Sequence, residues 1–268
     1  MGRPVGGWRS DCGEGVCPSG ADRVLASRPS TGRPRDLATR AGRDLGGLRL
    51  LLPGSRRTQR PEAIAAFAEA ALNVGTGRLV LLSGRGEEEA SRAEQALQAS
   101  GADWTVVRCS WFNQNFSESF ALGPVLAGEV ALPVDAVQEP FVDADDIADV
   151  AVAALTEDGH LGQVYELTGP RLLTFGQAVG EIAQASGRDI SYLPISIEQF
   201  TAGLAEAGEP ADLVRLLAYL FTEVLDGRNA QLTDGVQRAL GREPRDFRDY
   251  ARDAAATGVW ASELAGRS

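Results

Sequence analysis

From residue 61 onward, short apolar segments alternate with amphipathic ones, and this alternation limits the folds open to the chain. The segments "RLVLLSG" (78–84) and "WTVVR" (104–108) are nearly continuous apolar runs of strand length. The segment before them, "RPEAIAAFAEAALNVG" (60–75), repeats apolar residues every three to four positions, as an amphipathic helix does. Strands without polar alternation are buried on both faces, so we predict an α/β fold with a parallel sheet between helices.

Signals for the ends of elements support the same order along the rest of the chain. Thr174 and Gln177 form the sequence pattern of a capping box, and Asp143 stands where a helix cap is expected. "LRLLLP" (48–53) is predicted to be the strand before the helix at 61–72. Further helices are predicted within 87–101, 141–158, 173–187, 211–227 and 240–260, and a further strand within 163–169. The apolar stripe of 211–227 favours core packing or a subunit contact over a cofactor site.

The basic residues restrict the possible chemistry. All 26 are arginine, so mechanisms that need an amine, such as a Schiff base or a lysine-tuned tyrosine, are excluded. The single histidine, His160, lies in "TEDGHLGQ" and is expected in a surface loop. "DADDIAD" (143–149) lacks the glycine and the glutamate of a calcium loop, so no metal site is predicted.

Charge and cysteine usage bound the partners and the compartment. A net charge of −11 argues against nucleic acid as a partner. The sequence contains no run of 18 apolar residues, so no membrane span is predicted. The three cysteines have no paired spacing, and the N-terminus has no apolar secretion signal, so a reducing cytoplasm is expected. Residues 1–60 differ from the rest because they hold twelve arginines against five acids.

The loop after the strand at 104–108 is unusual because it carries three large aromatic residues and two amides. In "DWTVVRCSWFNQNF" these are Trp111, Phe112, Asn113, Asn115 and Phe116. Connecting loops are usually small and polar. The loop therefore either lines a site for a flat aromatic ligand or plugs the edge of the sheet, and both interpretations stay open.

With "PFVDADDIADVAVAAL" (140–155) and "YELTGPRLLTFGQAVGEIA" (165–183), this loop resembles the NmrA-like, atypical branch of the short-chain dehydrogenase/reductase superfamily. The resemblance covers about residues 61–260. It implies a Rossmann-like, doubly wound parallel sheet that binds NADP or NAD, with a small C-terminal substrate-side lobe. We expect one domain over 1–268, with its core at 23–115 and 141–168. The lobe would comprise 116–140 and 169–250, while 1–22 are poorly defined.

The resemblance also assigns roles to residues. It implies that Ser83, Gly84, Trp111 and Phe112 contact the cofactor. Phe112, Asn113, Asn115 and Phe116 would contact the substrate. In "RVLASRPSTGRP" (23–34), Ser27 and Arg28 would bind the cofactor, with Arg28 clamping the 2′-phosphate of NADP.

Two departures from the family pattern limit these expectations. The usual Tyr-x-x-x-Lys proton donor is missing, so the protein would supply orientation and exclude water while water supplies the proton. The first strand and Gly-rich turn are not recognisable; "MGRPVGG" supplies Gly2, Gly6 and Gly7 without a strand before them. We therefore hypothesise that residues 1–60 are partly out of frame or start too late relative to a functional ancestor.

The function expected from the resemblance is an NAD(P)H-dependent reductase of small flat or cationic acceptors, such as quinones, azo compounds, iminium ions or dyes. One alternative is a non-catalytic sensor of the dinucleotide redox state that acts through a protein partner. Another is a relative that binds no dinucleotide because its N-terminal unit is damaged. A homodimer is a further possible partner arrangement, and the catalytic residues stay unknown.

Overall fold

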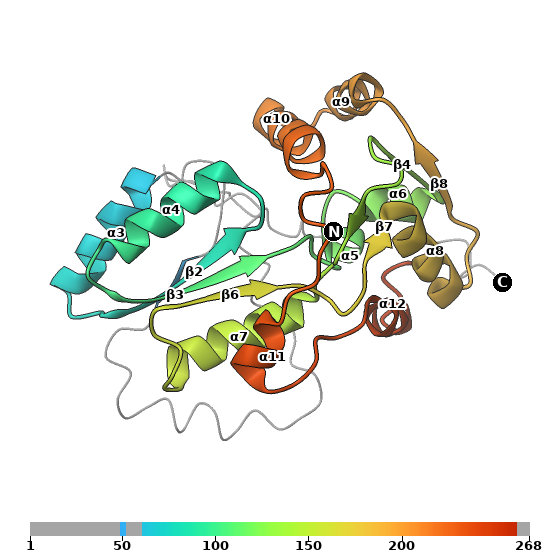
Figure 1. Ribbon diagram of the computed structural model, residues 1–268. Helices are drawn as coiled ribbons and strands as arrows, with labels where there is room; N and C mark the ends of the chain where they lie inside the picture. The colour runs from blue at the N-terminus through green and yellow to red at the C-terminus, as the bar shows by residue number, and fades with distance from the viewer. Residues whose placement is uncertain (1–48, 52–60, 262–268) are drawn as a thin grey trace, which may run out of the picture. The chain divides into compact units, whose positions relative to one another are not determined.

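A computed structural model describes residues 49–51 and 61–261, and its centre is a parallel sheet (Figure 1). The strands β1 (Arg49–Leu51), β2 (Arg78–Gly84), β3 (Asp103–Cys109) and β6 (Gln163–Leu167) lie in the order β1-β2-β3-β6. All three neighbouring pairs are parallel, with Val80 opposite Thr105 and Thr105 opposite Gln163. The predicted α/β class and the strand predicted within "LRLLLP" are confirmed.

Helices cover both faces of this sheet, as the unbroken apolar strands predict. Figure 1 shows α3 (Pro61–Asn73) and α4 (Glu88–Gln98) on one side, and α7 (Ala144–Thr156) and α11 (Gly235–Leu240) on the other. Successive side chains of a strand point to opposite faces. Leu79, Leu81 and Val106 accordingly pack with α3 and α4, whereas Val80, Leu82 and Val107 pack with α7 and α11.

A third hydrophobic cluster, which we call the aromatic core, lies among the other elements. It is built around the rings of Phe116, Phe141, Phe175 and Phe247, and five of their six pairs have centroids 4.9–6.1 Å apart. The surrounding helices are α5 (Asn115–Glu118), α6 (Leu122–Ala127), α8 (Phe175–Ser186), α9 (Ile197–Glu206), α10 (Ala211–Tyr219), the π-helix η2 (Leu220–Val224) and α12 (Phe247–Ala256). The strands β4 (Glu129–Leu132) and β8 (Ser191–Pro194) pair in parallel, and β5 (Gln138–Glu139) and β7 (Leu173–Thr174) pair antiparallel.

Backbone hydrogen bonds join the three chain segments that pass between the sheet and the aromatic core. Val142 donates to the Trp111 carbonyl (2.8 Å), and Asn113 donates to the Val142 carbonyl (2.9 Å). Gly169 donates to the Pro140 carbonyl at 3.1 Å. A Cβ at position 169 would lie 2.1 Å from the Phe141 carbonyl oxygen, so this close approach of two backbones requires glycine.

Several local predictions are confirmed. The Asp143 carboxylate caps α7 by accepting from the Asp145 N–H at 2.9 Å. Thr174 and Gln177 form both hydrogen bonds of the capping box at the start of α8. The carboxylates of Asp146 and Asp149 pair with Arg242 and Arg245, which the sequence did not predict.

Other local predictions need correction. His160 is not a surface residue: its side chain is buried, and Nδ1 lies 2.8 Å from the Tyr165 hydroxyl. The turn is folded back because the His160 carbonyl accepts from the Thr105 hydroxyl, which anchors it to β3. The apolar segment 211–227 changes from α- to π-helix at Leu220. The tail helix predicted within 240–260 is shorter than expected: it is α12 (Phe247–Ala256), whereas Leu240 ends α11 and Gly241 follows it with a φ of 67°.

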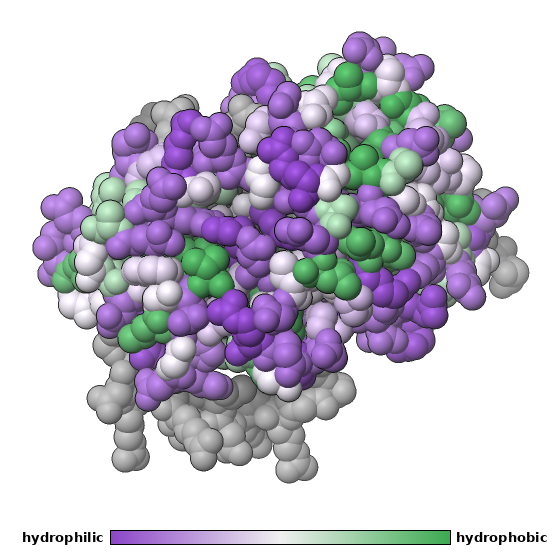
Figure 2. All heavy atoms as spheres, viewed as in Figure 1, coloured by the Kyte–Doolittle hydropathy of each residue, from purple (hydrophilic) through white to green (hydrophobic). Residues whose placement is uncertain are grey.

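The surface of the described residues is mixed in character. On the face shown in Figure 2, hydrophobic side chains are interspersed among hydrophilic ones, as is ordinary for a folded protein. The most exposed large hydrophobic residues are Leu72, Val74, Leu126, Val152, Leu161, Leu193 and Leu232. Apart from Leu72 and Val74, they are separated by nine or more positions in the sequence, and the homodimer stays a prediction. None of the helices in 61–261 is both long and apolar enough to span a bilayer.

Candidate active site

A cavity of about 180 Å³ lies at the carboxyl ends of β2 and β3. In open parallel sheets, ligands bind at this edge because the loops leaving neighbouring strands converge there. Five of the residues predicted for the site line the cavity: Ser83, Gly84, Trp111, Phe112 and Asn115. The structure thus brings together two segments that the sequence separates by more than twenty residues.

Ser83 ends β2 with its hydroxyl already engaged. Its Oγ donates to Oε1 of Glu94 on α4, so the hydroxyl has lone pairs but no proton left to offer a ligand. Glu94 is held in turn by Arg108, which also pairs with Glu166 on β6. These groups form a chain of hydrogen bonds and ion pairs that fixes the Ser83 oxygen at the cavity wall.

Trp111 and Phe112 give the cavity its aromatic wall. The Trp111 ring packs against Phe175 and Phe221, with centroids 5.4 and 5.1 Å away, so its orientation is set by the aromatic core. Phe112 packs against the hydrophobic cluster between the sheet and the helices α7 and α11. Since Trp111 and Phe112 belong to different cores, the cavity lies where the two cores meet.

Asn113 and Phe116 were predicted to contact substrate, but the structure does not bring them to the cavity. Phe116 is 0% exposed and packs among the other phenylalanines of the aromatic core. Asn113 is also 0% exposed, and neither polar atom of its side chain has a partner within the described part of the chain. Phe116 therefore packs at the edge of the sheet, as the second interpretation of the loop would have it. Trp111 and Phe112 instead line the cavity.

Arg85 is a cavity residue that the sequence interpretation missed. It follows β2 directly, its side chain is almost fully buried, and Nη1 donates to the carbonyls of Asn229 (2.9 Å) and Gln231 (3.1 Å). Nε lies 3.5 Å from Oε2 of Glu166. The remaining nitrogen, Nη2, has no hydrogen-bond partner among the residues that the structure describes. Arg85 directly follows Ser83 and Gly84 at the carboxyl end of β2, and this position is the sequence signal that could have identified it.

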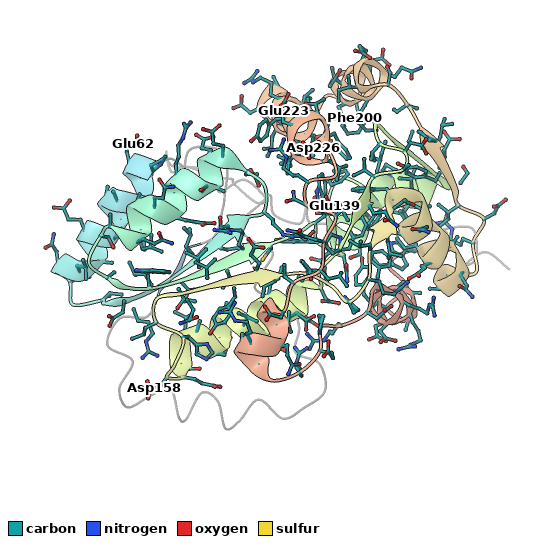
Figure 3. The ribbon with its side chains drawn as sticks, viewed as in Figure 1. Glu62, Glu139, Asp158, Phe200, Glu223 and Asp226 are labelled. Atoms are coloured by element: carbon teal, nitrogen blue, oxygen red, sulfur yellow. The ribbon has the colours of Figure 1, made fainter. Side chains whose placement is uncertain are left out.

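Glu139 is the second missed residue, and it lies where the carboxyl edge of the sheet meets the aromatic core (Figure 3). The residue is 1% exposed; Oε2 accepts from Ser110 Oγ at 3.0 Å, and Oε1 has no partner in the described ranges. Burial raises the pKa of Glu139 to about 7, although the Ser110 hydrogen bond and Arg85 oppose the shift. No local pattern in "VQEPFVD" marks this glutamate as buried, because only the fold brings it beside Ser110.

Further cavity residues come from distant parts of the chain. Leu220 and Val224 of η2 and the buried Asn229 close one side. Cys109 also lines the cavity, and burial raises the pKa of its thiol, which disfavours a nucleophilic thiolate. Glu87 completes the wall beside Gly84.

The cavity fits one end of a nicotinamide dinucleotide. Its volume is below the 300–1,000 Å³ usual for sites of whole drug-sized ligands, so it would hold only the reactive ends of the ligands. Aromatic faces and the Ser83 acceptor match a nicotinamide ring and its amide. Ser27, Arg28 and the glycines of "MGRPVGG" lie outside the described residues, so the roles expected for them toward the pyrophosphate and 2′-phosphate stay predictions.

Known proteins similar to this chain are reductases and dinucleotide-binding proteins. An NAD(P)H azoreductase of Xenophilus azovorans is 31% identical over 201 residues, which cover 72% of this chain and 70% of that protein. The NADPH-dependent quinone oxidoreductase QOR2 of Escherichia coli, solved with NADPH, superposes with a TM-score of 0.67 at 22% identity, covering 77% of this chain and 76% of the other.

The negative transcriptional regulator NmrA, solved with NAD, has the same fold. It superposes with a TM-score of 0.57 at 18% identity, over 82% of this chain and 76% of the other. A scan against models of protein families finds no match. The identity to the azoreductase and its coverage show that the chain belongs to the NmrA-like family of Rossmann-fold, NAD(P)-binding proteins.

Proposed function

We propose that the protein is an NAD(P)H-dependent reductase that transfers hydride to a small flat acceptor. The observation that supports this most directly is the cavity at the carboxyl edge of the sheet, with an aromatic wall and the two buried ionisable groups Arg85 and Glu139. A small concave site that combines aromatic faces with placed polar groups is typical of pockets that orient a planar ligand. The name of the Xenophilus relative, NAD(P)H azoreductase, supports the same class of reaction.

In this proposal the cofactor supplies the hydride when bound, and the protein supplies position and a dry environment. Ser83 and Gly84 lie along one edge of the nicotinamide position, where the fixed Ser83 oxygen accepts a hydrogen bond. Trp111 and Phe112 hold the flat acceptor against that position. The buried aromatic residues behind Trp111 keep its ring from turning and exclude water. The acceptor is then held in an orientation close to the reactive one, which lowers the entropic cost of reaction. NADP is preferred over NAD if Arg28 has its expected role.

The proposal is tested by following NADPH and NADH oxidation with a panel of a quinone, an azo dye and an iminium ion. We expect turnover with at least one acceptor, and an increase of several-fold in the KM for NADPH in Ser83→Ala. Ser91→Ala is the matched control, because Ser91 is exposed on α4. Background oxidation with every acceptor, measured on folded protein, would refute the reductase. Micromolar NADPH binding without any turnover would instead favour the non-catalytic sensor.

A further inference from the structure

Two groups of the cavity are buried with one polar atom each left unpartnered. Arg85 is 6% exposed and Glu139 is 1% exposed, yet Arg85 Nη2 and Glu139 Oε1 have no hydrogen-bond partner in the part of the chain that the structure describes. Both residues line the same cavity. Buried polar atoms are nearly always paired. Asn113 also has unpartnered atoms but lies away from the cavity, whereas those of Arg85 and Glu139 belong to residues that line it and can be completed by a ligand.

The hydrogen bonds already present decide what each group offers. Arg85 stays charged, and Nη1 and Nε are occupied, so Nη2 is left as a donor. In Glu139, Oε2 accepts from Ser110, which leaves Oε1 as the atom that carries the proton when the carboxyl group is neutral. Burial favours that neutral form near neutral pH. The cavity therefore presents a fixed positive donor and a protonated carboxyl together.

The other charged and titratable groups near Glu139 do not remove this proton. Glu87 and Cys109 share the cavity, and Asp226 raises the pKa of Glu139 by charge repulsion (Figure 3). The Arg85 charge lowers the pKa of Glu139, but it is partly neutralised by the ion pair of Arg85 with Glu166. On the neighbouring strand β7, the residue opposite Glu139 is the apolar Leu173.

We propose that Glu139 is the proton donor of this site, that Arg85 holds the acceptor oxygen, and that the acceptors are quinones or α,β-unsaturated carbonyl compounds. This inference rests on the proposed reductase function and narrows its acceptor class. Permanent cations are disfavoured, because they meet the Arg85 charge in a low-dielectric cavity and need no proton.

The electron and proton balance of the step is simple. Hydride from NAD(P)H forms a new C–H bond at the acceptor carbon as the conjugated π bond breaks, which oxidises NAD(P)H and reduces the acceptor. The electron pair moves to the carbonyl oxygen, where Arg85 Nη2 stabilises the negative charge. The O–H bond at Oε1 of Glu139 breaks and its proton passes to that oxygen. Water later returns a proton to the carboxylate.

The protonation state is testable without cofactor or turnover. Infrared difference spectra of the purified protein across a pH titration are expected to contain a protonated-carboxyl band that disappears around a pH of about 7. The band should be absent in Glu139→Gln and retained in Glu129→Gln, a control at an exposed glutamate on β4. A wild-type protein in which this band has vanished well below pH 7, or a band that survives in Glu139→Gln, would overturn the assignment.

Acceptor turnover tests the role itself. Glu139→Gln is expected to lower kcat with a quinone by about 10²-fold or more, the usual contribution of a positioned proton donor, and much less with a cationic dye. Arg85→Gln, checked for folding by circular dichroism, should lower quinone turnover and raise that of the dye. Quinone turnover unaffected in Glu139→Gln overturns this inference and leaves the reductase standing. A normal infrared titration without turnover of any acceptor refutes the reductase, and with it the proton-donor role.

Discussion

At the scale of single residues, the buried carboxyl of Glu139 makes stability depend on pH. The folded protein raises the pKa of this group from 4.5 to about 7, so the folded state binds the proton more tightly than the unfolded state does. Between these two values, a rise in pH therefore lowers the free energy of unfolding contributed by Glu139. Below pH 4.5 the carboxyl group is neutral in both the folded and the unfolded state. Above a pH of about 7 the stability that Glu139 contributes is completely lost.

We predict that Glu139→Gln removes this pH dependence. Relative to wild type, the variant should gain stability between pH 5 and pH 8, by at most about 3 kcal/mol, because each pKa unit corresponds to roughly 1.4 kcal/mol. Urea denaturation of both proteins at the two pH values measures the difference. If the free energies of unfolding of variant and wild type differed by the same amount at pH 5 and at pH 8, the pKa of Glu139 would not be shifted.

Phe116 gives a second prediction at this scale, because the structure places it in the aromatic core. Phe116→Ala should lower the free energy of unfolding by about 3–5 kcal/mol, as expected when a fully buried ring is removed. Chemical denaturation measures this loss. If Phe116→Ala instead left stability unchanged and raised the KM for the acceptor, the original substrate assignment would be restored.

The residues of the candidate site were predictable only in part. Ser83, Gly84, Trp111, Phe112 and Asn115 line the cavity, and they were identified from the resemblance to the NmrA-like family and from the unusual aromatic loop. Glu139 could not be identified, because its place depends on tertiary pairing of β5 with β7. His160 was misassigned because its glycine-flanked turn gives no sign of the Thr105 hydrogen bond that draws it inward.

At the scale of elements, the joint between the sheet and the aromatic core depends on one glycine. Gly169→Ala should lower stability by about 1–3 kcal/mol, since its Cβ would overlap the Phe141 carbonyl and one backbone must move. Gly180→Ala is the matched control: it lies in α8 with open space around it, and alanine there should add roughly 0.5–1 kcal/mol. Thermal unfolding of the two variants would show shifts in opposite directions, and shifts of the same sign would contradict the packing argument.

The elements themselves were the most predictable part of the fold. Strands β2, β3 and β6 and the capped helices α7 and α8 follow from local composition and caps, which act within a few residues. The change to a π-helix at Leu220 did not follow, because the apolar pattern of 211–227 continues across it. The tail helix begins at Phe247 and not near residue 240, because Gly241 ends the separate helix α11.

At the scale of the whole described region, the sheet, with a hydrophobic cluster on each face, and the aromatic core share one boundary. The connections between them are short and hydrogen-bonded to one another, as Ser110 donates to the Leu167 carbonyl (3.1 Å) and Val142 to that of Trp111 (2.8 Å). Trp260, 1% exposed, donates from Nε1 to the Phe116 carbonyl at 2.8 Å. The aromatic core thus continues beyond residue 250, where the predicted lobe ends, and that boundary stays a prediction.

This arrangement predicts that the sheet and the aromatic core unfold together. Trp104 packs at the sheet and Trp260 in the aromatic core, so their fluorescence reports the two regions separately. Trp104→Phe and Trp260→Phe assign the signal of each tryptophan, and both should change at one urea concentration because neither core retains its connections alone. NADPH at about 100 times its Kd should then raise both midpoints equally, with about 2.7 kcal/mol added to the free energy of unfolding. Two separate midpoints, with only the Trp260 signal moved by NADPH, would instead mean that the aromatic core binds the ligand without the sheet.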